Sequence, residues 1–126
     1  MNFQDQRETI AFLSEPSTFE VSAPVEAIET HISRIFLAGD RVFKMKRAVK
    51  LPYVDFSTPE LRLAACRKEV ELNSTTAPDL YIGVRRITRE ASGRLLFDGE
   101  GELTDAVVDM KRFEQSALLD RMAEAG

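Results

Sequence analysis

Asp40-Arg41-Val42-Phe43-Lys44-Met45-Lys46 is the stretch on which the fold and the candidate site depend. Successive side chains of a β-strand point to opposite faces of the sheet. Phe43 and Met45 therefore share one face, which is suited to burial. Lys44 and Lys46 share the other face with Val42. Such a face either lines a polar cleft or belongs to an edge strand whose lysines meet water.

A carboxylate on the next predicted helix offers these lysines a partner. Ser57-Thr58-Pro59-Glu60 predicts a helix start in which Ser57 is the cap and Glu60 occupies the capping-box position. We expect the helix to run to Asn73 or Thr75, since Pro78 cannot continue it.

Glu69 lies between two apolar columns of this helix. The columns are Leu61, Ala65 and Leu72, and Leu63, Cys66 and Val70. A buried carboxylate needs a cation or several hydrogen bonds, and the lysines of the preceding strand are the nearest candidates. On periodicity alone, a surface acid that pairs with Arg62 or Asn73 fits equally well.

The remaining periodicity predicts the other elements of the chain. They are a helix at 3–14, an antiparallel pair over 25–49 with a bend near 30–33 and a tight reversal at 38–40, a loop at 50–56, strands at 81–88, 94–98 and 106–113, an acidic loop at 99–105 and a helix at 115–125. We expect an N-terminal helix and lead-in over 1–24, followed by a single domain over 25–126. The fold class is α+β, with an antiparallel sheet of about five strands, one main helix packed on it and short helices at both ends.

The composition is typical of a globular domain and excludes several functions. The 126 residues are 44% hydrophobic and 30% charged, with a net charge of -4, so neither a nucleic acid nor a membrane is an expected partner. The one cysteine, Cys66, excludes an internal disulfide and fits a reducing compartment. With no apolar run of spanning length, we expect a cytoplasmic protein. One histidine and one cysteine do not make a zinc site, and we predict no metal ligands in this chain.

A strand lysine paired with a helix glutamate in a small antiparallel sheet is how protein kinases hold ATP. The lysine contacts the phosphates, and the glutamate fixes the direction of the lysine. Arg41-Val42-Phe43-Lys44 follows the pattern of the kinase strand, which favours Lys44 over Lys46 as the phosphate lysine. The pattern leaves the choice between the two open.

Several ordered blocks of the chain resemble the start of bacterial proteins similar to aminoglycoside phosphotransferases. The blocks are residues 30–33, 36–47, 55–62, 69–73, 77–84 and 107–113. Many members of that group also carry a C-terminal P-loop ATP-binding or gluconate kinase-like domain. The resemblance implies a nucleotide-binding kinase N-lobe with ATP as its ligand, whose partners include a C-lobe and such a P-loop domain.

Carried over residue by residue, the resemblance implies a set of nucleotide-binding residues. Lys44 or Lys46 contacts phosphate, Glu69 orients it, His31 and Ser33 lie at the phosphate-covering hairpin, and Met110 lies near the adenine hinge. His31 also fits a plain strand residue with a backbone hydrogen bond.

The chain departs from the kinase pattern in two respects. No glycine-rich loop precedes the lysine strand, and no catalytic-loop Asp or metal-binding Asp follows the expected hinge. We therefore expect no catalytic residues here, no phosphoryl transfer by this chain alone, and Mg²⁺ binding only together with a C-lobe. The alternative function is a non-catalytic α+β interaction module that self-associates as a homodimer.

Overall fold

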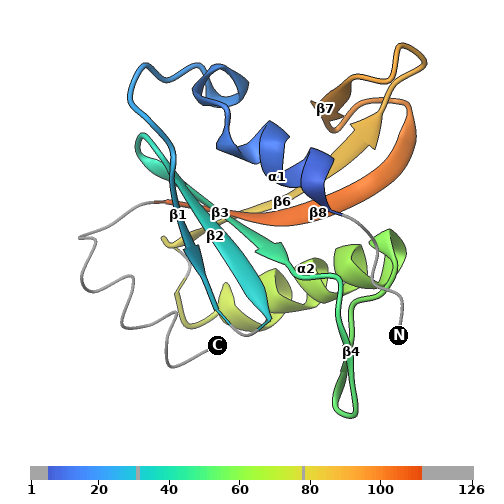
Figure 1. Ribbon diagram of the computed structural model, residues 1–126. Helices are drawn as coiled ribbons and strands as arrows, with labels where there is room; N and C mark the ends of the chain where they lie inside the picture. Colours follow the sequence, from blue (N-terminus) through green and yellow to red (C-terminus); the bar gives the residue numbers. More distant parts are fainter. Residues whose placement is uncertain (1–5, 31, 78, 112–126) are drawn as a thin grey trace.

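The computed structural model describes residues 6–30, 32–77 and 79–111, which form an α+β fold (Figure 1). Its elements, in chain order, are α1 (Arg7–Ser14), the 3₁₀ helix η1 (Pro16–Phe19), β1 (Glu26–Glu29), β2 (Ser33–Ala38), β3 (Arg41–Lys46), β4 (Lys50–Leu51), β5 (Val54–Asp55), α2 (Pro59–Asn73), β6 (Tyr81–Arg89), β7 (Leu95–Phe97) and β8 (Glu102–Lys111). The predicted helix at 115–125 and the end of the predicted strand at 112–113 lie outside the described residues.

Six strands form one sheet in the order β1-β2-β3-β8-β6-β7, and every neighbouring pair is antiparallel. The strand with the two lysines, β3, lies between β2 and β8. In the strand register, Lys44 pairs with Ile35 of β2 and with Val108 of β8. The interpretation of β3 as an edge strand is therefore wrong. Both of its edges are hydrogen-bonded within the sheet.

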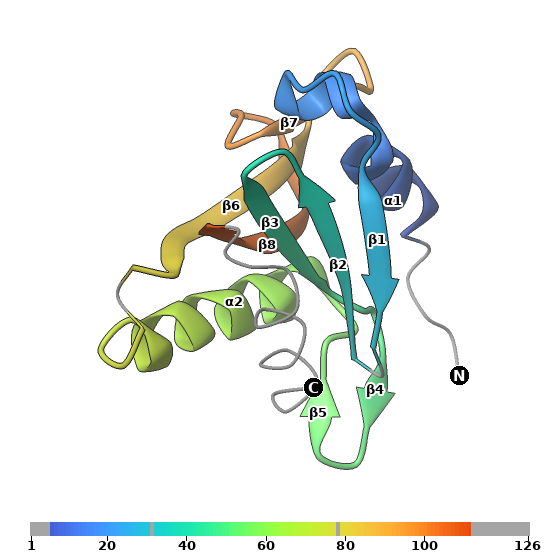
Figure 2. The ribbon, with the colours of Figure 1, turned by 90° about the vertical axis from the view of Figure 1, so that its left-hand side faces the viewer.

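The two faces of the sheet are covered by different helices. Figure 1 shows the sheet between α1 and α2, and Figure 2 shows α2 crossing beneath β6 and β8. The cluster on the α2 face consists of Ile35, Leu37, Val42, Cys66, Leu80, Ala106, Val108 and Met110. The cluster on the α1 face consists of Leu13, Phe36, Ala38, Phe43, Met45, Ile87, Leu95 and Val107. The alternation predicted for β3 is confirmed, because Phe43 and Met45 pack under α1 while Val42 packs under α2.

The chain reverses twice before β3, where the sequence predicts one bend and one turn. Between β1 and β2, the Thr30 amide donates to the Ser33 carbonyl at 2.8 Å, and the Ser33 amide donates to Thr30 Oγ1 at 3.1 Å. These bonds close a complete turn, so 25–49 holds three strands rather than a pair. The turn at 38–40 is confirmed. Gly39 has φ +60, and a Cβ there would lie 3.0 Å from Val21 Cγ1.

Two predicted loops contain strands. Residues 50–56 hold the small hairpin of β4 and β5, which projects from the body of the fold (Figure 2). The acidic loop at 99–105 ends earlier than expected, because β8 begins at Glu102 and pairs with Arg89 of β6. In both places hydrogen bonding to a partner strand overrides weak local strand preference.

The start of α2 lies one residue later than predicted. Thr58 is the cap, and its Oγ1 accepts a hydrogen bond from the Leu61 amide at 3.2 Å. Ser57 Oγ instead donates to Asp55 Oδ1 at 2.6 Å. Pro59 occupies the first helical position as expected, but Glu60 is one residue too early to complete a capping box.

The side of α2 that meets the sheet differs from the predicted one. The column of Leu63, Cys66 and Val70 packs in the core, as expected. Leu61 and Leu72 are instead 40% and 62% exposed, so the other predicted column faces outward. In place of that column, the helix buries Arg62, which forms an ion pair with Asp105 of β8.

Candidate functional site

Glu69 of α2 meets both lysines of β3 on the covered face of the sheet. Lys44 Nζ lies 3.3 Å from Glu69 Oε2, and Lys46 Nζ contacts Glu69 Oε1. Lys44 and Lys46 are only 7% and 6% exposed. The hypotheses that the lysines are solvated and that Glu69 is a surface acid paired with Arg62 are both wrong.

Helical spacing explains how α2 presents this carboxylate to the sheet. Arg62, Cys66, Glu69 and Asn73 recur at intervals of three or four residues, which places them on one side of the helix. Arg62 and Cys66 are fully buried against the sheet. Asn73 contacts the backbone of Glu69 and not its carboxylate, since Asn73 Nδ2 donates to the Glu69 main-chain carbonyl at 2.8 Å. The Glu69 carboxylate therefore points to the lysines.

Burial and charge act in opposite directions on the Glu69 carboxylate. Burial by itself raises its pKa, but the charges of Lys46 and Lys44 outweigh that effect and hold the pKa below its ordinary value. For Lys44, burial is the larger effect. It lowers the pKa of the ammonium group, although the Glu69 carboxylate raises it. Glu69 is therefore held ionised, while the burial of the Lys44 ammonium group is only partly compensated.

Lys44, Lys46 and Glu69, here called the triad, line a pocket of about 200 Å³. The pocket is lined by Ile32, Ser33, Lys44, Lys46, Glu69, Asn73 and Tyr81. Tyr81 Oη lies 3.5 Å from Glu69 Oε2, at the limit of a hydrogen bond. These lining residues carry two ammonium groups and one carboxylate, so the pocket has a net positive charge and is suited to an anion.

The turn between β1 and β2 forms one wall of the pocket. Ile32 and Ser33 come from this turn and the start of β2. Ser33 pairs with Lys46 in the β2–β3 register, which places it beside the site. His31 lies outside the described residues.

The structure thus brings together four of the six residues predicted to bind nucleotide, namely Lys44, Lys46, Glu69 and Ser33. Met110 does not line the pocket. It is 2% exposed in the core under α2, where it pairs with Val42 of β3 and Tyr81 of β6. Its assignment to an adenine hinge stays a prediction.

Three lining residues, Ile32, Asn73 and Tyr81, are not among the predicted site residues. Asn73 lies four residues after Glu69, so helical spacing was the signal that could have found it. Tyr81 had no such signal, because it reaches the α2 face through a shift in register between Tyr81 and Gly83 in β6. A β-bulge of this kind changes which face a side chain occupies.

A larger groove, of about 590 Å³, lies between the α1–η1 segment and β7. Glu8 and Arg94 are the charged residues that line it, together with apolar and small polar side chains such as Phe12, Thr18 and Phe97. This groove is on the opposite face of the sheet from Glu69, and it concentrates no charge of one sign.

Membrane-spanning helices and clustered metal ligands are both absent from the described part of the chain. No helix within the described ranges is both long and apolar enough to cross a membrane. In the same part of the chain, no three His, Cys, Asp or Glu side chains gather in a way that would hold a metal ion.

Similar proteins exist in mycobacteria. Proteins of Mycobacterium bovis and Mycobacterium tuberculosis, described only as uncharacterized, are 36% identical to this chain over 102 residues. The match covers 81% of the chain and 19% of those proteins, so the chain spans about a fifth of the length of the curated relatives it matches. No protein-family model matches the chain. No solved structure matches it either.

Proposed function

We propose that this chain is the nucleotide-binding N-lobe of a small-molecule phosphotransferase that resembles the aminoglycoside phosphotransferases. The observation that carries the proposal is the buried triad of Lys44, Lys46 and Glu69 in a pocket with excess positive charge. A nucleoside triphosphate such as ATP supplies the anion that this charge favours.

The geometry supports a division of roles between the two lysines. Lys46 and Glu69 form the closer contact, and Glu69 thereby neutralises one of the two ammonium groups. Lys44 makes the longer contact with Glu69, and burial lowers the pKa of its ammonium group. In this proposal Lys44 contacts a phosphate of the nucleotide, while Glu69 and Lys46 hold the surrounding geometry.

The remaining parts of the reaction belong to other regions of a longer polypeptide. The match covers only a fifth of the mycobacterial proteins, which supports a lobe that works together with further domains. A catalytic Asp, the Mg²⁺ ligands and the acceptor site are assigned in this proposal to a C-lobe. In this proposal the chain contributes nucleotide binding and the C-lobe contributes the base, so we expect no transferase activity from this chain alone.

Titration of the 126-residue chain with ATP and with inorganic tripolyphosphate, by calorimetry or NMR, tests the proposal. We expect weak binding that Lys44→Met reduces at least tenfold, because the pocket then loses its excess charge. Lys68→Met is the matched control, since Lys68 lies on the exposed side of α2. Equal affinity of the Lys44→Met and wild-type chains, or no binding at millimolar ATP, would remove the assignment.

A second candidate function is a self-associating interaction module. The exposure of large apolar side chains favours it, since Leu61, Leu72 and Tyr53 are 40%, 62% and 73% exposed. Light scattering separates the two candidates. A stable dimer that Leu61→Ser with Leu72→Ser dissociates, and that binds no nucleotide, would favour the module over the lobe.

A further inference from the structure

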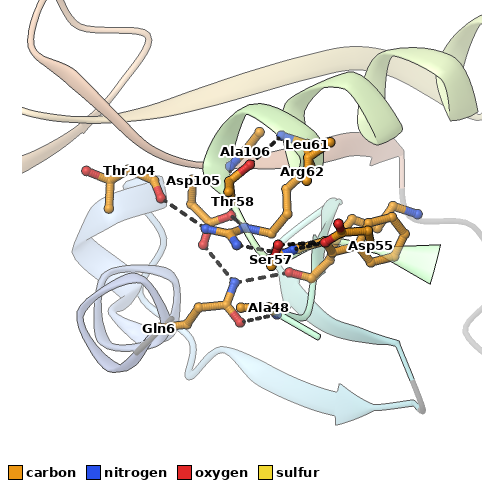
Figure 3. A network of polar contacts seen from close by, with 12 residues as sticks. Gln6, Ala48, Asp55, Ser57, Thr58, Leu61, Arg62, Thr104, Asp105 and Ala106 are labelled. Carbon is orange, nitrogen blue, oxygen red and sulfur yellow. Dashed lines mark hydrogen bonds and ion pairs between the residues drawn. The ribbon is translucent and has the colours of Figure 1, made fainter. Parts of the chain in front are cut away.

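Asp105 of β8 uses both of its carboxylate oxygens inside the fold (Figure 3). Arg62 Nε donates to Asp105 Oδ1 at 2.8 Å, and Gln6 Nε2 donates to Asp105 Oδ2 at 2.8 Å. Arg62 and Asp105 are both 0% exposed. One buried carboxylate thus joins three segments that are remote in sequence.

Arg62 transmits this anchor to α2. Besides Asp105, its guanidinium donates from Nη1 to the Phe56 carbonyl at 2.8 Å and from Nη2 to the Thr104 carbonyl at 3.3 Å. A planar guanidinium held by three acceptors has a fixed orientation. Glu69 follows Arg62 by seven residues, nearly two helical turns, so the two side chains lie on the same side of α2. Fixing the rotation of the helix at Arg62 therefore also fixes the direction in which Glu69 points.

Gln6 transmits the same anchor to β3. Its Nε2 also donates to the Lys46 carbonyl at 3.1 Å, and its Oε1 accepts from the Ala48 amide at 2.9 Å. Figure 3 shows Gln6 bridging Asp105 and the segment that contains Ala48. The backbone that carries the Lys46 ammonium group is therefore tied to the carboxylate that orients Glu69.

Stability alone does not account for this arrangement. Replacement of a buried ion pair by apolar side chains of similar volume is often neutral or stabilising, so such a pair contributes geometry more than free energy. Here hydrogen bonds connect Asp105 to both partners of the Lys46–Glu69 contact. Gln6 makes the connection to the Lys46 backbone, and Arg62 makes the connection to the helix that carries Glu69.

We propose that Asp105, acting through Arg62 and Gln6, is a positioning residue that aligns the Lys46–Glu69 ion pair from the opposite end of α2. The alignment concerns this chain alone, and its consequence for nucleotide affinity rests on the proposed function. Loss of the hydrogen bonds from Arg62 and Gln6 to Asp105 lets α2 rotate and the end of β3 shift. These movements separate the Lys46 ammonium group from the Glu69 carboxylate.

Gln6→Met is the primary variant. It removes the hydrogen bonds that connect Asp105 to the Lys46 carbonyl, and it leaves no charge buried and unpaired. Thr18→Ala is the matched control. It removes the bond from Thr18 Oγ1 to the Phe12 carbonyl, 2.7 Å long, in the same N-terminal region but away from Asp105. The readout is the NMR signals of the Lys44 and Lys46 ammonium groups, recorded beside urea unfolding of each variant.

We expect Gln6→Met to shift the Lys46 ammonium signal and to weaken ATP binding at least threefold. Thr18→Ala should leave these signals unchanged even where its loss of stability is similar. Unaltered lysine signals in Gln6→Met, or equal changes in Thr18→Ala, would overturn the positioning role. If the wild-type chain binds no ATP, the proposed function fails, while the lysine signals still decide the positioning role.

The double variant Arg62→Met with Asp105→Leu provides an independent test. It removes both charges together, so the folded chain keeps its core but loses the anchor of α2. A folded double variant with a displaced Lys46 signal supports the proposal. A folded double variant with the wild-type Lys46 signal contradicts it.

Discussion

Lys44 Nζ lies 3.3 Å from Glu69 Oε2, and both side chains are about nine-tenths buried, at 9% and 12% exposure. This contact joins an internal strand of the sheet to the helix that covers it. Lys46 occupies the other carboxylate oxygen, so a single acid serves two buried cations. The excess charge is the feature that suits the site to an anion, and several measurable consequences follow from it.

Glu69→Gln should destabilise the chain by about 3 kcal/mol, because it leaves two buried ammonium groups without an acid. Urea unfolding at neutral pH measures the loss. Glu71→Gln is the control, since Glu71 lies on the same helix but is exposed, and it should change the unfolding midpoint little. A Glu69→Gln chain as stable as the control would show that the lysines do not need this carboxylate.

The contribution of Glu69 should be lost at acid pH. Its pKa is lowered in the folded chain from an ordinary value of 4.5, because the charges of Lys46 and Lys44 outweigh its burial. A lowered folded-state pKa gives stability that is fully present above the unfolded value and disappears as the pH falls through the folded value. The difference in unfolding free energy between the wild-type and Glu69→Gln chains should therefore shrink below about pH 4.5. A difference that stays constant down to pH 2.5 would contradict this.

Cys66 should weaken the fold at alkaline pH. Burial raises the pKa of its thiol from 9.0 to about 12, so between these values the unfolded chain loses a proton that the folded chain keeps. Stability therefore falls as the pH rises from about 9 towards 12. Relative to Cys66→Ala, the wild-type chain should lose about 1 kcal/mol between pH 7 and pH 10, measured by urea unfolding. Parallel pH profiles of the two chains would rule out the raised thiol pKa.

Thr58→Ala should cost about 1 kcal/mol of stability, because it removes the side chain that caps α2. Ser57→Ala tests the residue that the sequence pattern favours as the cap. Its hydroxyl bonds to Asp55 on an exposed segment, so its removal should lower the thermal midpoint less than Thr58→Ala does. The reverse order of the two midpoints would place the cap at Ser57.

Local sequence signals predicted much of the fold. The alternation around Phe43 and Met45, the reversal at Gly39 and the start of α2 near Pro59 depend on neighbouring residues, and the structure has all three. The pairing of Glu69 with the β3 lysines was one of two alternatives that the sequence left open, and the structure has it.

The errors lie in two short turns and in one contact between distant segments. The bend near residue 30 is a full turn because Thr30 and Ser33 close it, and residues 50–56 form a hairpin because Leu51 finds Val54 as its partner. Tyr81 reaches the site only through a bulge in β6. None of these outcomes leaves a strong trace in the local pattern of apolar residues.

The amino-acid pattern alone established an α+β chain with a buried-type strand face, a lysine-bearing face opposite it and an acid on the following helix. These properties arise from the strand and helix periods and from turn chemistry, which neighbouring residues determine. Pairing of β3 with β8 placed the lysines inside the sheet. The ion pair with Asp105 of β8 determined that α2 buries the side that carries Arg62. Contacts between remote segments decided both, because the burial of a charge depends on the surface that covers it.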